Sequence, residues 1–193
     1  MNFPDQFPVL TTARLVLRPT VPHDVEGVFA MESDPVAMRY WSRPPMQELA
    51  EARASVERAM TFFAARDGLR WSITRAGEDR LIGQISLFNF NEQSGRADIG
   101  YGLARAHWGQ GFMHESLIAV IDYAFGPMGL RRLEADIDPR NHASLRALER
   151  LGFAREGLLP ERWQVGDEIS DSALLGLLAR DWRAWQAAET TAS

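Results

Sequence analysis

Two glycines one residue apart, Gly109 and Gly111, stand between a segment of alternating apolar residues and a segment with a helical apolar face. A helix that begins there presents unpaired main-chain N–H groups and the positive end of its dipole. Glycine lets a ligand approach those groups closely because it has no Cβ atom. The pattern predicts a loop that binds phosphate with its main chain, although a tight turn between strand and helix would use the same residues.

The basic residues narrow the chemistry, because all 21 of them are arginine. A Schiff base with pyridoxal phosphate and the P-loop contact with nucleotide phosphates both need lysine, so both kinds of site are excluded. The chain has no cysteine either, which excludes a thiolate nucleophile and a thiolate metal site. Its four histidines form no ligand-spaced cluster, so we expect no metal; they are His23, His107, His114 and His142.

The composition predicts a single globular domain, since 193 residues with 46% hydrophobic content can bury a sizeable core. A net charge of −5 lacks the basic excess that drives nucleic-acid binding, so no direct nucleic-acid partner is expected. No run approaches the roughly 18 apolar residues of a membrane span, and the first residues are not those of a signal peptide. We therefore expect a cytoplasmic protein with no membrane partner.

The periodicity of the apolar residues places strands and helices around the glycine loop. Strands are expected at 14–18, 70–75, 80–90, 96–104, 132–137, 153–163 and 170–178. Helices are expected at 24–32, at 48–66, from the glycine loop to Gly126, between Asn141 and Gly152, and at 181–185. The order β-α-α-β-β-β-α-β-α-β-β predicts a mixed α/β sheet rather than a regular doubly wound one.

Several short motifs together resemble the GNAT superfamily of acetyl-CoA-dependent N-acetyltransferases, and within it the RimJ/RimL-like ribosomal-protein N-terminal acetyltransferases. They are Thr12-Ala-Arg-Leu-Val-Leu-Arg18, Tyr101-Gly-Leu, Trp108-Gly-Gln-Gly-Phe-Met-His-Glu115, Asn141-His-Ala-Ser144, Leu151-Gly-Phe153 and Glu156-Gly157. The match spans about residues 11–178 and leaves a short helical tail at 180–188. It implies one N-acetyltransferase domain over 1–193, with a mostly antiparallel twisted sheet, about four helices and a splayed central strand pair.

The resemblance implies which residues hold acetyl-CoA, the expected co-substrate. Main-chain amides of the loop would bind the pyrophosphate, and the backbone of the preceding strand would pair with the pantetheine arm. These positions are Trp108, Gly109, Gln110, Gly111, Phe112 and Met113 in the loop, Tyr101, Gly102 and Leu103 in the strand, and Asn141 and Ser144 opposite. The superfamily often has Gln or Arg three residues before the first glycine. Here that position is Ala106, with Arg105 one place earlier as the residue that could replace it.

The resemblance also implies a direct transfer to a primary amine, since no cysteine is present to form an acyl-enzyme. Ser144 is the expected proton donor to the departing thiolate, although Asn141 and Ser144 are also ordinary helix-capping residues. The general base would be Glu161 or Asp98, with proton removal through water as the alternative. An α-amino group, with a pKa of about 8, needs little help, whereas a lysine side chain at about 10.4 needs much more.

The acceptor is predicted less sharply than the donor. The resemblance favours a protein N-terminus, such as that of a ribosomal protein, and the alternatives are an amino sugar, a polyamine or an antibiotic. A non-catalytic acyl-CoA sensor is an alternative of a different class. Trp41, Phe88 and Asn89 are expected to wall the acceptor cleft, although aromatic residues in such places also belong to protein cores. Either a monomer or a homodimer is compatible with the sequence.

Overall fold

The eight strands among the described residues belong to one sheet, in the order β1-β2-β3-β4-β5-β6-β8-β7. The computed structural model describes residues 1–192, and the side chains of residues 1–188. The strands are β1 (Leu10–Thr11), β2 (Leu15–Pro19), β3 (Gly68–Arg75), β4 (Leu81–Asn91), β5 (Arg96–Leu103), β6 (Arg132–Ile137), β7 (Ala154–Val165) and β8 (Glu168–Leu178). Neighbouring strands are antiparallel except for the parallel pair β5 and β6.

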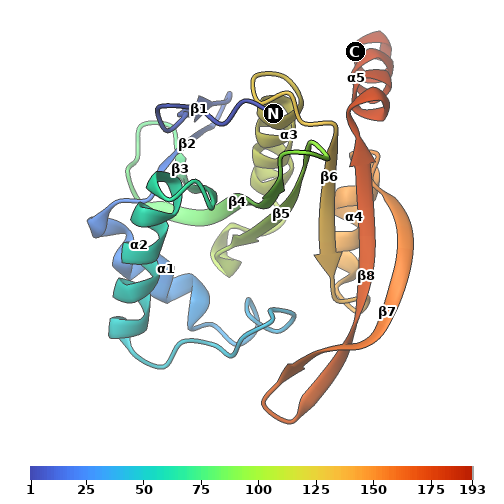
Figure 1. Cartoon of the computed structure of the whole chain (residues 1–193). Helices are drawn as coiled ribbons and strands as arrows, with labels where there is room; N and C mark the ends of the chain where they lie inside the picture. Colours follow the sequence, from blue (N-terminus) through green and yellow to red (C-terminus); the bar gives the residue numbers. More distant parts are fainter. Residues whose placement is uncertain (193) are drawn as a thin grey trace.

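Helices cover both faces of this sheet (Figure 1). They are α1 (Val25–Glu32), α2 (Leu49–Ala64), α3 (Phe112–Phe125), α4 (His142–Arg150) and α5 (Ala179–Ala192). Helices α1 and α2 pack together and against β4 and β3, whereas α3 packs against β1 and β2. Figure 1 shows α3 and α4 behind the sheet and α1 and α2 in front of it. Residues of α3 and α4 can therefore reach β5 and β6 from one face only.

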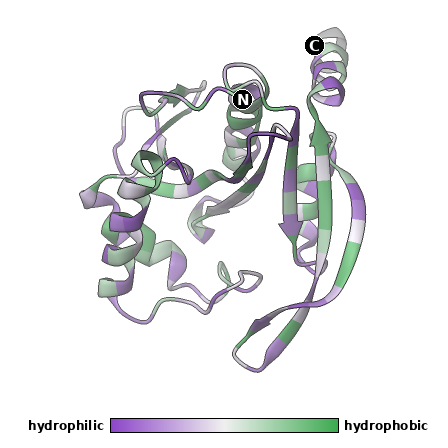
Figure 2. Cartoon of the chain, viewed as in Figure 1, coloured by the Kyte–Doolittle hydropathy of each residue, from purple (hydrophilic) through white to green (hydrophobic). Residues whose placement is uncertain are grey.

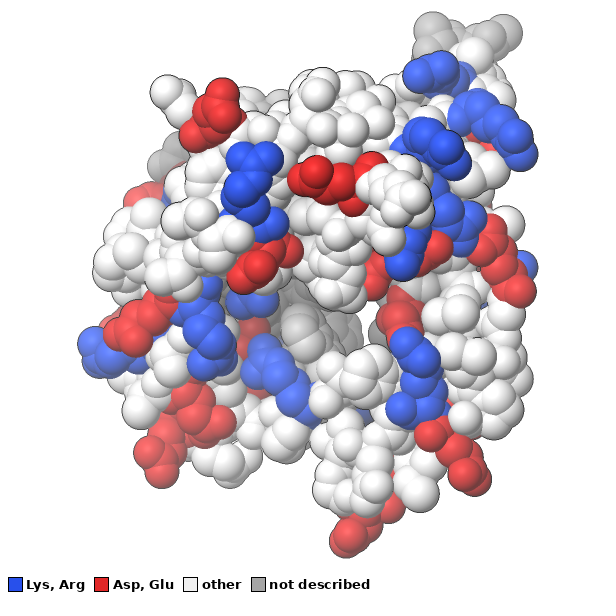
Figure 3. Space-filling view, viewed as in Figure 1, with Lys and Arg blue, Asp and Glu red and all other residues white. Residues whose placement is uncertain are grey.

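The middle of the sheet opens because its parallel pair is short. Residues 96–98 of β5 pair with residues 132–134 of β6, and the pairing ends there. Strand β5 nevertheless continues to Leu103 and β6 to Ile137. In the space-filling view the surface is hollowed between the part with α1 and α2 and the part with β6 and β8, and charges of both signs surround the hollow (Figure 3). The main chain of β5 beyond Asp98 thus faces an opening.

The core lies between the sheet and the pair α3 and α4. Apolar residues alternate along the strands, so that every second side chain points to these helices; Figure 2 shows this alternation as bands along β8. The buried cluster includes Ala97, Ile99, Leu133, Ala135, Leu117, Ile121, Leu145 and Leu148. Burial of a side chain such as leucine contributes about 1.5–3 kcal/mol. This packing fixes where α3 and α4 begin relative to the opening.

The predicted order of elements and the mixed α/β fold are confirmed, with two differences. The two-residue strand β1 was not expected, because a segment this short shows no periodicity. The described residues form five helices, which is the number that the periodicity predicts and one more than the approximate count that the resemblance implies, and α5 is longer than the expected tail. Trp182 of α5 is buried, stacks on Trp185 and donates from Nε1 to Asp122 Oδ1 at 2.7 Å. None of the helices among residues 1–192 is both long enough and apolar enough to cross a membrane.

Candidate active site

The glycine loop, residues 108–113, joins β5 to α3 in a conformation that favours glycine. Gly109 has φ +72° and Gly111 has φ +80°, both in the left-handed region. Gly111 is the N-cap of α3, so the cap residue has no side chain to occupy the first N–H groups of the helix. A Cβ atom on Gly109 would meet no described atom within 4 Å. Open space therefore adjoins the unpaired N–H groups of a helix N-terminus, an arrangement that suits a phosphate group.

The side chains of the loop are engaged elsewhere and leave its main chain accessible. Trp108 Nε1 donates to Leu103 O at 2.7 Å, and Gln110 Nε2 donates to Ala106 O at 3.1 Å. Phe112 is buried in the core, and Met113 packs against the core. An anion at this place would thus be held by backbone amides, as the glycine spacing predicts.

Arg105, His107 and His114 flank the glycine loop in the sequence and have different surroundings. Arg105 pairs with Asp34 at 2.9 Å and is thereby directed towards the end of α1. Burial, together with Arg75 and Arg80, lowers the pKa of His107, so this imidazole is neutral at pH 7. His114 is half-buried in the first turn of α3.

Tyr101 and Ser144 meet across the face of the sheet that α4 covers. Their hydroxyl oxygens are 2.6 Å apart, and Ser144 is only 9% exposed. The helix cap is made by Asn141, whose Oδ1 accepts the Ser144 N–H at 3.1 Å. Burial raises the pKa of Tyr101 to about 12, so the phenol is protonated at neutral pH. The Ser144 hydroxyl therefore takes no part in the helix cap, and its partner is the hydroxyl of Tyr101.

The opposite face of β5 carries two glycines, on which aromatic rings rest. A Cβ on Gly102 would lie 2.6 Å from Trp41 Cζ2, and one on Gly100 would lie 3.1 Å from Phe88 Cε1. Asn89, at the bulge of β4 with φ +51°, donates from Nδ2 to Asp98 Oδ2 at 2.8 Å. The structure thus brings the three expected acceptor residues to one face of one strand, beside one of the two expected bases.

The segment between α1 and α2 that carries Trp41 contacts both α1 and the residues that follow β6. The guanidinium of Arg43 lies 5.3 Å from the Trp41 ring centre, and Arg43 Nη2 is 2.6 Å from a carboxylate oxygen of buried Glu32. Tyr40 lies 5.9 Å from the guanidinium of Arg140, which follows β6. This segment therefore borders the opening between β5 and β6.

The two expected general bases have different surroundings. Burial raises the pKa of half-buried Asp98, and the hydrogen bond from Asn89 opposes this shift. Glu161 lies on exposed β7 with φ +52°, and its main-chain N–H donates to Asp171 Oδ1 at 2.9 Å. Within the described residues, none of its hydrogen bonds reaches Ser144 or Asp98. Of the two carboxylates, Asp98 is thus the one connected to the acceptor face.

Two groups near the opening were not singled out by the sequence. The first is the side chain of Tyr101, because the resemblance implies a role in binding the pantetheine arm only for its main chain. Glu134 and Asp136 of β6 point to the same face as Asp98, since Glu134 is the register partner of Asp98. The alternation of charged and apolar residues along β6 was the available signal. Within the part of the chain that the structure describes, no three acidic or histidine side chains gather as a metal site would require.

The family model and the relatives that match this chain point to the same protein family. Residues 14–154 match the acetyltransferase (GNAT) domain. The chain is 35% identical over 153 residues to the N-acetyltransferase YoaA of Bacillus subtilis, covering 79% of this chain and 86% of that protein. It is 32% identical over 173 residues to the N-acetyltransferase p20 of Bacillus licheniformis, covering 90% and 97%. A shorter match, 31% over 106 residues and about half of each chain, is to the ribosomal protein uS5-alanine N-acetyltransferase of Escherichia coli.

Solved structures share this fold. A GNAT-family acetyltransferase from Bacillus anthracis superposes with a TM-score of 0.80 at 24% identity, covering 90% of this chain and 99% of that one. Spermidine N-acetyltransferase from Vibrio cholerae, in complex with CoA and spermine, gives 0.78 at 21%, covering 89% and 99%. The sequence match spans most of the chain and the sheet opens beside the glycine loop. The chain therefore belongs to the GNAT acetyltransferase family and is an N-acetyltransferase.

Proposed function

We propose that the protein transfers an acetyl group directly from acetyl-CoA to a primary amine, with a protein N-terminal α-amino group as the acceptor. The observation that carries the donor half is the opening between β5 and β6, which lies next to the left-handed glycine loop. The loop would hold the diphosphate through the main chain of residues 108–113. The edge of β5 that faces the opening, at residues 101–103, would pair with the pantetheine arm, and Asn141 would contact that arm from α4.

The residues around the opening suit the steps of the transfer. The amine attacks the thioester carbonyl, the carbon–sulfur bond breaks, and the sulfur leaves with the electron pair. Ser144 would donate a proton, or a hydrogen bond, to this sulfur from the face that α4 covers. On the other face, Asp98 or a water molecule would accept the proton that the attacking nitrogen loses. Glu161 is the alternative base.

The acceptor face is aromatic and carries the carboxylate of Asp98. Trp41 and Phe88 would wall the site, and Asn89 would fix the carboxylate of Asp98. The carboxylates of Glu134 and Asp136 on β6 are paired with arginines, Glu134 with Arg96 and Arg132 and Asp136 with Arg162, so they add little net negative charge to this face. The E. coli relative named for a ribosomal-protein alanine supports a protein N-terminus as acceptor. A polyamine is the second candidate acceptor, because the spermidine N-acetyltransferase from Vibrio cholerae shares this fold.

An acceptor screen tests this assignment. Purified protein is supplied with acetyl-CoA and with peptides that differ in their first residue, with spermidine and spermine, and with amino sugars, and acetylated products are measured by mass spectrometry. We expect acetylation at the α-amino group of a subset of the peptides. If only the polyamines are acetylated, the acceptor is a polyamine and not a protein N-terminus.

The donor assignment predicts a selective thermal shift. Ligand at about 100 times its dissociation constant stabilises the folded state by about 2.7 kcal/mol. For a chain of this size, that corresponds to a rise in Tm of about 5–10 °C. We expect coenzyme A and acetyl-CoA to produce such a rise and ATP with magnesium to produce none. A protein that is stabilised by ATP and indifferent to coenzyme A would contradict the assignment.

A further inference from the structure

Arg14 reaches the glycine loop from the other end of the chain. It lies in the bend between β1 and β2, and its partners are found at the start of α3. Nε donates to Glu115 Oε2 at 2.7 Å, and Nη1 donates to the main-chain oxygen of Gln110 at 3.0 Å. The guanidinium lies 4.7 Å from the centre of the Phe112 ring. A Cβ on Gly111 would be 3.3 Å from Nη2. One side chain thus contacts both the loop and the first turn of the helix.

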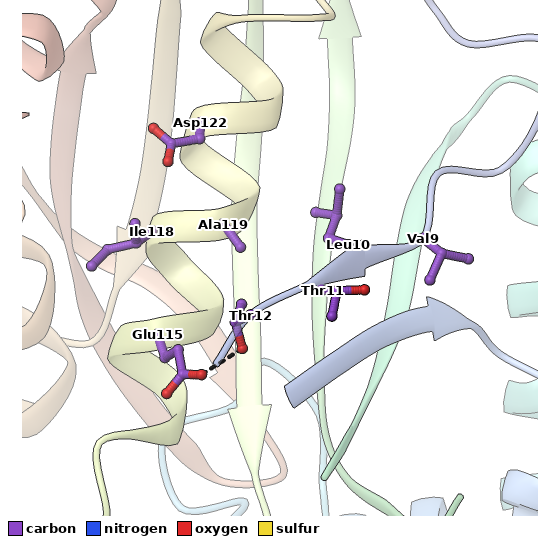
Figure 4. A pocket seen from close by; sticks show the side chains of 8 residues that line it. All are labelled: Val9, Leu10, Thr11, Thr12, Glu115, Ile118, Ala119 and Asp122. Atoms are coloured by element: carbon purple, nitrogen blue, oxygen red, sulfur yellow. Dashed lines mark hydrogen bonds between the residues drawn. The ribbon is translucent and has the colours of Figure 1, made fainter. Parts of the chain in front are cut away.

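The carboxylate of Glu115 is held firmly by the same bend. The Arg14 main-chain N–H donates to Glu115 Oε1 at 2.9 Å, and the Thr12 hydroxyl donates to the same oxygen. Figure 4 shows Thr12 and Glu115 facing each other at one end of a pocket between β1 and α3. Burial alone would raise the pKa of Glu115, but the hydrogen bonds from Thr12 and Arg14 outweigh it and the pKa lies below its usual value. Glu115 is therefore ionised at neutral pH.

The charges of Arg14 and Glu115 act in opposite ways on a phosphate bound at the start of α3: the guanidinium attracts it and the carboxylate repels it. An anion in the first turn of a helix is favourable for the helix itself, whereas a cation at that end opposes the helix dipole. Glu115, left alone, would repel a phosphate bound at the N-terminus of α3. Arg14 cancels this charge, and it keeps a half-exposed guanidinium beside the loop, where a bound diphosphate would offset its unfavourable interaction with the dipole.

We propose that Arg14 is a positioning residue of the acetyl-CoA phosphate site, which holds the glycine loop in place and compensates the charge of Glu115. This inference rests on the proposed binding of acetyl-CoA by that loop. Since position 106 is alanine and Arg105 turns to Asp34, Arg14 supplies the cation that the loop itself lacks. The residue acts through the loop and not on the reacting atoms.

The test compares Arg14→Ala, Glu115→Gln and the double variant by calorimetric titration with coenzyme A. We expect Arg14→Ala to weaken coenzyme A binding about tenfold, which is about 1.4 kcal/mol. The double variant should recover part of this loss, because the uncompensated carboxylate is gone. Arg14→Lys keeps the positive charge but not the planar set of donors of the guanidinium. Its affinity for coenzyme A should therefore lie between those of the wild type and Arg14→Ala.

Two controls separate a phosphate-directed role from general damage. S-acetylpantetheine has no phosphate, so its kcat/KM should be nearly the same for wild type and Arg14→Ala. Arg155→Ala removes a comparable surface pair, in which Nε of Arg155 is 2.6 Å from Glu149, and it should leave coenzyme A binding unchanged. Equal losses with coenzyme A and S-acetylpantetheine, or no loss in a folded Arg14→Ala protein, would overturn the inference. A wild-type protein that does not bind coenzyme A would instead overturn the proposed function.

Discussion

Replacing Ser144 by alanine is expected to lower the turnover number about 100-fold while the affinity for acetyl-CoA changes little. The hydroxyl would act on the departing sulfur, so its loss is felt mainly in the transition state. General acid assistance is worth about 10²–10⁴-fold, and the low end applies because a thiol with a pKa of about 8.5 leaves readily. Turnover, the dissociation constant of acetyl-CoA and the unfolding midpoint should be measured on the same preparation.

A purely structural role for Ser144 gives a different pattern. The helix cap belongs to Asn141, which the substitution leaves in place, so a loss of stability above about 1 kcal/mol is not expected. Ser55→Ala is the matched control, since it removes a buried serine hydroxyl in α2, away from the opening. If Ser144→Ala lowers the midpoint and keeps normal turnover, as we expect for Ser55→Ala, the proton-donor role is wrong.

Replacing Gly109 by alanine is expected to weaken coenzyme A binding by at least tenfold. The new methyl group would occupy the open space beside the loop, which is where the diphosphate would approach. Alanine at a left-handed position also costs about 1–2 kcal/mol of stability, whatever the position does. Affinity by titration and stability by chemical unfolding must therefore be compared for the same variant.

Gly77→Ala supplies the matched control for this effect. Gly77, in the turn between β3 and β4, has φ +83°, and a Cβ atom added to it would meet no described atom within 4 Å, just as at Gly109. The two variants should lose similar stability, while only Gly109→Ala should lose affinity for coenzyme A. If the two variants bind coenzyme A with equal affinity, Gly109 serves only the turn and not the binding of coenzyme A.

The parts of the site that the sequence predicted are those with a local signal. The glycine loop follows from two glycines between two periodic segments, and both are left-handed in the structure. The acceptor residues Trp41 and Phe88 are predicted only as aromatic residues, Trp41 shortly before Pro44-Pro45 and Phe88 on the strand expected at 80–90. Their rings rest on Gly102 and Gly100 of β5, which made room for them and could not be recognised without the fold.

The parts that the sequence did not predict depend on contacts between distant segments. Tyr101 and Ser144 pair their hydroxyl groups because β5 and α4 pack on the same face of the sheet. Arg14 and Glu115 are 101 residues apart and meet only because the first bend folds against α3. Side chains in such pairs look like ordinary surface or capping residues in the sequence. Their roles, and those of Glu161 and Asp98, stay predictions until variants are measured.

The central claim is a direct transfer from acetyl-CoA to an amine, and one measurement tests it. Purified protein is mixed with acetyl-CoA, with and without the amine that the acceptor screen identifies. Free thiol is followed over time, and the protein mass is recorded by mass spectrometry. The account predicts thiol release only when the amine is present, in step with acetylated amine, and an unchanged protein mass. Thiol release without the amine, together with a protein mass increased by one acetyl group, would contradict it.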